Sequence, residues 1–154
     1  MRTVKCGFQS VPGGKPANGL LILMGPTLIV DIGFDPAFTS TTTTPPISGI
    51  QSVHALVDTG ATESCIDNLL AAQLGLPIID RRSVSGSSGK HDVNVYMAQV
   101  HVPSLPYTIW GAFAGVDLKA GGQVHGALIG RTFLANFKME YDGTTGDVTL
   151  TTHL

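Results

Sequence analysis

The chain has 154 residues, enough for one domain with a buried core. Only 13% of them are charged, 19 are glycine and 9 are proline, and this composition favours a turn-rich, all-β protein over a helical bundle. The formal net charge is -2, and the basic residues form no cluster beyond Arg81-Arg82, so we expect no nucleic-acid partner.

The N-terminal part of the chain is predicted to divide at residue 20. Residues 1–19 contain several glycines and prolines and are predicted to form a loose arm with room for one short strand. Residues 20–154 are predicted to form a single domain that begins with two strands, 20–24 and 27–32, separated by the turn dipeptide Gly25-Pro26. The run 20–24 is too short to span a bilayer and lacks the flanks of a signal peptide, so we expect no membrane partner and a cytoplasmic protein.

After a Thr- and Pro-rich segment at 39–46, predicted as a surface loop, the short apolar strand Val53–Val57 ends abruptly in Asp58-Thr59-Gly60. A carboxylate at the end of a buried strand is costly unless it is hydrogen-bonded or used in chemistry. Thr59 offers a hydroxyl beside it, and Gly60, which has no Cβ, lets a ligand approach the backbone. The same residue types are ordinary in β-turns, so the tripeptide alone leaves both interpretations open.

A short helix is predicted over Asp67–Leu74, with Asp67 as its N-cap and with Gly75 and Pro77 ending it. Its expected role is structural, because it would place three leucines on the outer sheet: Leu69, Leu70 and Leu74.

Neither the 2 cysteines nor the 5 histidines indicate a further site. Cys6 and Cys65 do not make a disulfide framework. Cys65 has no His or Asn in a recognisable cysteine-protease context, so we expect a buried, unreactive thiol. The histidines lack metal-ligand spacing, and no metal or cofactor is predicted.

Residues 83–90 are predicted to form a hairpin in which two extended arms flank the tip Gly86-Ser87-Ser88-Gly89. The tip has no bulky side chain, which suits backbone hydrogen bonding to an extended peptide. An ordinary solvent-exposed hairpin is the alternative. Farther along, Ala127–Ile129 is predicted as a strand, and a final hairpin is expected to join residues 137–141 to 148–152.

Two segments together resemble the retropepsin-like aspartic proteases. Asp58-Thr59-Gly60-Ala61 after an apolar strand is similar to the active-site signature of that family, and Ala127–Leu134 is similar to its hydrophobic-hydrophobic-Gly-Arg-x-x-Leu segment. Each occurs once and in the family's order. The resemblance spans residues 20–150 and implies a lobe of closed, barrel-like sheets with one or two short helices, one of them at 130–136. It also implies a mobile hairpin, the flap, at residues 83–90.

The resemblance also implies roles for individual residues. The catalytic residues would be Asp58, Thr59 and Gly60. The substrate-binding residues would be Ala61 and Thr62 in the turn, and Ser85, Gly86, Ser87, Ser88 and Gly89 in the flap. Gly130 and Arg131 would be structural.

Peptide hydrolysis by the chemistry of this family needs two aspartates that share one proton. The ionised carboxylate takes a proton from an attacking water, and the protonated one hydrogen-bonds the scissile carbonyl oxygen, without a metal. The chain has one Asp-Thr-Gly and no Asp-Ser-Gly, so the second Asp58 is expected from a second copy in a homodimer. We therefore expect an aspartic endopeptidase acting on proteins or peptides. The alternative is a retropepsin-fold binding or dimerisation module with little turnover.

One position departs from the retroviral pattern. Retroviral members carry an acidic residue directly after Asp-Thr-Gly-Ala, where this chain has Thr62, followed by Glu63. Arg131 would then either pair with Glu63 or anchor backbone carbonyls, and the sequence leaves both open.

Overall fold

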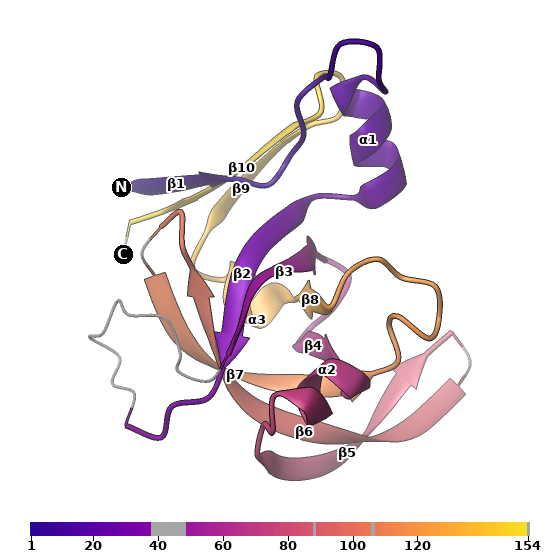
Figure 1. Cartoon of the computed structure of the whole chain (residues 1–154), viewed down its shortest axis with the longest axis vertical. Coiled ribbons are helices and arrows are strands. Elements are labelled where there is room, and N and C mark those ends of the chain that lie inside the picture. Colours follow the sequence, from indigo (N-terminus) through magenta and orange to yellow (C-terminus); the bar gives the residue numbers. More distant parts are fainter. Residues whose placement is uncertain (38–48, 88, 106, 154) are drawn as a thin grey trace.

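A computed structural model of the chain describes residues 1–37, 49–87, 89–105 and 107–153 (Figure 1). The larger sheet has the strand order β2-β3-β8-β4-β7-β6-β5, and an additional pairing of β2 with β6 closes all of it except β5 into a barrel. Its strands are β2 (Thr27–Gly33), β3 (Ile50–Val57), β4 (Ser64–Asp67), β5 (Ile78–Gly86), β6 (Gly89–Val102), β7 (Tyr107–Val116) and β8 (Ala127–Ile129). The predicted all-β, barrel-like lobe with a projecting hairpin is confirmed.

A second, three-stranded sheet joins the two ends of the chain (Figure 1). β1 (Arg2–Lys5) runs antiparallel to β10 (Asp147–Thr152), which pairs in turn with β9 (Lys138–Asp142). The predicted C-terminal hairpin is therefore confirmed. Val4 and Cys6 are buried against the core, so this part of the N-terminal segment is packed. The division of the chain at residue 20 stays a prediction.

The strand predicted at 20–24 is wrong, because these residues lie in the helix α1 (Ala17–Met24). Leucine and methionine are good helix formers, and a short apolar run does not distinguish a buried strand from a helix by its periodicity. Gly25 ends the helix with φ +68°, and its N–H donates to the carbonyl of Leu21 at 2.9 Å. The dipeptide Gly25-Pro26 thus separates a helix from a strand.

The helix predicted after the Asp58 turn is confirmed as α2 (Asn68–Gln73), but two details differ. Asp67 makes no capping hydrogen bond, because its Oδ1 accepts from the N–H groups of Leu118 at 3.0 Å and Lys119 at 3.3 Å. Leu69 is 65% exposed and does not cover the sheet, whereas Leu70 and Leu74 pack on the core.

The helix expected at 130–136 is also confirmed, as α3 (Arg131–Leu134). The predicted loop 39–46 lies outside the described residues. Within the described ranges, no helix has both the length and the apolar character needed to cross a membrane.

Candidate active site

The barrel brings Asp58 to the ends of two parallel strands. Alternate residues of β3 are buried in the core, among them Val53, Ala55 and Val57. β3 pairs in parallel with β8, with Val57 opposite Ile129, and the N–H of Asp58 donates to the Ile129 carbonyl at 2.9 Å. Because parallel strands end at the same edge of a sheet, the turn after β3 lies beside the residues after β8. The two sequence segments that carry the resemblance therefore meet in space.

The turn after β3 holds the Asp58 carboxylate and leaves its other residues open. Oδ1 of Asp58 accepts the N–H of Gly60 at 2.9 Å, and the Ala61 N–H donates to the Asp58 carbonyl at 3.3 Å. Asp58 is half-buried, whereas Thr59 and Gly60 are exposed. A Cβ on Gly60 would lie 3.0 Å from Oδ1 of Asp58, tighter than ordinary contact, so a side chain here would press on the carboxylate. The tripeptide is thus a turn that orients a carboxylate.

Arg131 anchors this turn from the other segment. Its Nη1 donates to the Thr59 carbonyl at 2.8 Å and its Nη2 donates to Oγ1 of Thr62 at 2.9 Å. The main chain adds two bonds, from the Arg131 N–H to the Ala61 carbonyl at 2.9 Å and from the Thr132 N–H to the Thr62 carbonyl at 3.0 Å. Of the two roles left open by the sequence, Arg131 takes the second and anchors a backbone carbonyl.

Gly130 explains how the two segments come so close. Its N–H donates to Oγ of Ser64 at 3.0 Å, and a Cβ at this position would lie 2.5 Å from the carbonyl carbon and oxygen of Glu63. Backbone cannot give way as the end of a side chain can, so only glycine fits here.

A cleft of about 1090 Å³ lies between the turn and the β5–β6 hairpin. The turn contributes Gly60, Ala61 and Thr62, and the hairpin contributes Ser85 among other residues. The fold therefore brings together three of the predicted substrate-binding residues: Ala61, Thr62 and Ser85.

The predicted substrate-binding residues at the tip of the hairpin differ from Ser85. Gly86 pairs with Gly89 at the end of the ladder. Among the residues that the structure describes, Ser87 and Gly89 do not line the cleft. Ser88 lies outside the described residues.

The far end of the cleft holds polar residues that sequence reasoning missed. Nδ2 of Asn68 donates to Oδ1 of Asp117 at 2.9 Å, and the Tyr96 hydroxyl donates to Oδ1 of Asn68 at 3.4 Å. Asn68 begins α2, Asp117 directly follows β7 and Tyr96 lies in the middle of β6, and no local pattern joins them. The parallel pairing of β4 with β7, which sets Asp67 opposite Val116, brings the first two together.

Cys65 lines the same cleft but is not a nucleophile in its resting state. Burial, followed by the negative charges of Asp58 and Glu63, raises the pKa of its thiol to about 11. The thiolate that attacks a carbonyl is therefore scarce at neutral pH. Cys65 is half-buried, so the expectation of a buried side chain is wrong.

No cluster of three metal-binding side chains occurs in the part of the chain that the structure describes. The donor groups nearest the turn, Asp58 and Glu63, are engaged by a backbone N–H and by Arg82 respectively.

Comparison with known proteins identifies one family whose model matches the chain. Residues 46–136 match a family model described as gag-polyprotein putative aspartyl protease. The matched region is more than half of the chain and contains the Asp58 turn, the hairpin and Gly130-Arg131. No curated protein matches the chain.

Proposed function

The chain belongs to the aspartyl protease family of gag polyproteins, and from this membership we propose that it is an endopeptidase whose active site is completed by a second copy of the chain. Each copy contributes one Asp58, and the two carboxylates share a proton across a two-fold axis. The substrate is a protein or peptide bound in extended form between the Asp58 turn and the hairpin.

The observation that carries this proposal is the way Asp58 is held. Its Oδ1 is oriented by the Gly60 N–H, while the turn around it is fixed by Arg131 through Thr59 and Thr62. A preorganised carboxylate two residues before Gly60, which lines the cleft, suits proton transfer in a transition state, because little reorganisation is then needed during reaction. The exposure of Thr59 and Gly60 leaves room for a facing copy of the same turn.

Other aspartates of the chain are less suited to supply the second carboxylate. Asp31 is buried on β2, where its Oδ1 accepts the Ser52 N–H at 2.9 Å. Asp92 accepts the Ser83 hydroxyl at 2.6 Å, and Asp117 accepts Asn68. Each of these three carboxylates accepts a hydrogen bond from a neighbouring residue and lies outside the Asp58 turn. This favours the Asp58 of a second copy as the partner carboxylate.

In the proposed reaction, the ionised Asp58 accepts a proton from a water as that water attacks the scissile carbonyl carbon. The protonated Asp58 donates a hydrogen bond to the carbonyl oxygen as it gains negative charge. The tetrahedral intermediate then collapses, the C–N bond breaks, and the amine leaves with a proton from the dyad. No covalent acyl-enzyme forms.

The proposal predicts that the protein cleaves members of a mixed peptide library, and that a statine-type transition-state mimic stops the cleavage. Such a mimic places a hydroxyl where the attacking water would be, so it should bind both carboxylates far more tightly than a substrate does. The assay is mass spectrometry of the library with and without the mimic. Peptide binding without cleavage would instead favour the binding or dimerisation module.

A further inference from the structure

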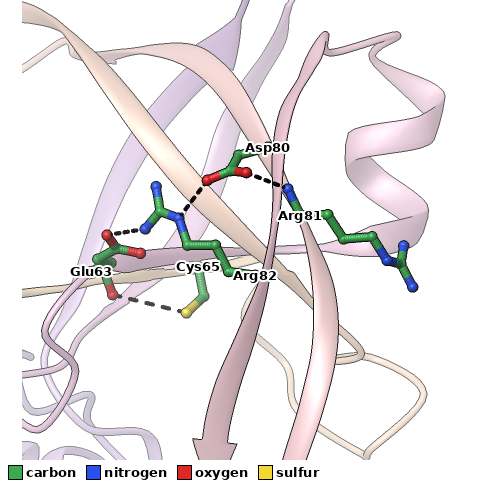
Figure 2. A network of polar contacts seen from close by, with 5 residues as sticks. All are labelled: Glu63, Cys65, Asp80, Arg81 and Arg82. Carbon is green, nitrogen blue, oxygen red and sulfur yellow. Dashed lines mark hydrogen bonds and ion pairs between the residues drawn. The ribbon is translucent and has the colours of Figure 1, made fainter.

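One ion pair joins the Asp58 turn to the hairpin that overlies the cleft. Nη1 of Arg82, on β5, contacts Oε1 of Glu63, which directly follows Thr62 in the turn. Nε of Arg82 also donates to Oδ2 of Asp80 at 3.0 Å. Figure 2 shows the Arg82 guanidinium between the two carboxylates, with the side chain of Arg81 pointing the other way.

The backbone at Glu63 is held in place by the segment that follows β8. The Glu63 carbonyl packs so closely on Gly130 that no side chain fits there, and Arg131 and Thr132 hold the preceding residue, Thr62. Glu63 therefore projects its carboxylate from a stretch of backbone that is held on both sides by the segment 130–132.

Arg82 lies at the root of the β5–β6 hairpin, next to the point where β6 stops pairing with β7. β6 pairs with β7 from Val95 onward, and β5 pairs with β6. Within the described residues, strand pairing in the segment 81–94 is internal to the hairpin, and Arg82 lies opposite Val93 at its root. A hairpin paired only with itself is marginally stable by its own ladder. Contacts from outside the ladder therefore have a large influence on its position.

The pair is consistent with the position of the acidic residue, which is Glu63 in this chain and not the preceding Thr62. Arg131 is occupied by Thr59 and Thr62, so it does not compete for the carboxylate one residue later. Glu63 instead pairs with Arg82 on β5.

We propose that Glu63 and Arg82 are positioning residues that tether the root of the hairpin to the turn carrying Asp58. The tether holds the root of the hairpin in the position in which hairpin and turn line one cleft. Its relevance to catalysis rests on the proposed function, but the tether itself does not. Asp80 lies on the same strand as Arg82, so its contact orients the guanidinium without joining the hairpin to the turn.

The test is amide hydrogen exchange of residues 81–94 in the protein without substrate. Side chains of Arg82 and Glu63 are 37% and 36% exposed, and pairs of this kind contribute modestly. Glu63→Gln and Arg82→Gln should each speed exchange in the hairpin by about two- to five-fold, with little change elsewhere. The double variant should be no faster than either single variant, because both remove the same contact. Glu140→Gln is the matched control, because it removes an exposed ion pair with Lys138 on β9 of the smaller sheet, and it should leave exchange in residues 81–94 unchanged.

Unchanged exchange in both single variants, or additive effects in the double variant, would overturn the tether. If the protein cleaves peptides, the same variants should raise KM by about two- to five-fold with a smaller change in kcat. Arg82→Lys, which keeps the charge, should recover part of the loss. A hairpin that responds as described in a protein without peptidase activity would leave the tether standing and remove the proposed function.

Discussion

Replacing Asp58 by asparagine is expected to reduce peptide cleavage by about a thousandfold or more, since a general acid–base group alone contributes about 10²–10⁴-fold. The amide oxygen of the new side chain can still accept the Gly60 N–H, so the turn should keep its shape. The amide cannot take a proton from the attacking water. Loss of turnover in a folded protein is therefore the expected result, measured by peptide cleavage together with circular dichroism.

Asp147→Asn is the matched control, because Asp147 lies at the start of β10 on the smaller sheet, outside the cleft lining. It should retain full activity. The Asp58→Asn variant should be at least as stable as the wild type in its dimeric form, since two facing carboxylates no longer repel each other. Near-wild-type turnover by Asp58→Asn would refute the catalytic assignment.

Gly130→Ala is expected to lower the free energy of unfolding by about 1–3 kcal/mol, the usual cost of forcing extra atoms into packed structure. The added methyl would meet the Glu63 backbone at 2.5 Å, and relief would require β8 and the Asp58 turn to separate. Because the same shift pulls Arg131 away from Thr59, activity should fall along with stability.

Gly19→Ala in α1 provides the comparison for this prediction. Its Cβ would lie 3.5 Å from Cγ of Pro16, an ordinary contact, and alanine favours a helix over glycine by about 0.8–1.0 kcal/mol. Urea unfolding should therefore show the Gly19→Ala variant to be as stable as the wild type or more so. A Gly130→Ala protein that unfolds at the wild-type urea concentration would contradict the packing argument.

The sequence predicts the strand before Asp58 and the Asp58 turn well because both depend on local signals, whereas the closed barrel is implied by the resemblance to a family. Val53–Val57 has the length and apolar character of a buried strand, and the residue types of Asp58-Thr59-Gly60 fit a turn. The hairpin is similarly local, since its Gly-rich tip follows directly from turn chemistry. The assignment of Gly130 and Arg131 as structural residues, by contrast, comes from resemblance to a family.

The remaining features depend on contacts between distant parts of the chain or on weak local signals. The sequence predicts a strand in place of α1 because a run of five apolar residues carries no decisive period, and the helical form is set by Pro16 before it and Gly25 after it. Asp67 has the residue type of a helix cap, but the loop after β7 offers it two N–H groups. The Glu63–Arg82 pair spans 19 residues and requires β5 to lie beside the turn that carries Asp58, which no local pattern encodes.

Mixing subunits tests the central claim, that one active site is shared by two identical chains. Wild-type and Asp58→Asn proteins are combined in equal amounts and allowed to exchange subunits, with exchange verified by mass spectrometry of differently labelled chains. Random pairing gives about one quarter wild-type dimers, one half mixed dimers and one quarter variant dimers. A mixed dimer has lost half of its dyad, so activity should fall to about half that of the same amount of wild-type protein left unmixed. Undiminished activity after verified exchange would show that each chain works alone and would contradict the shared site.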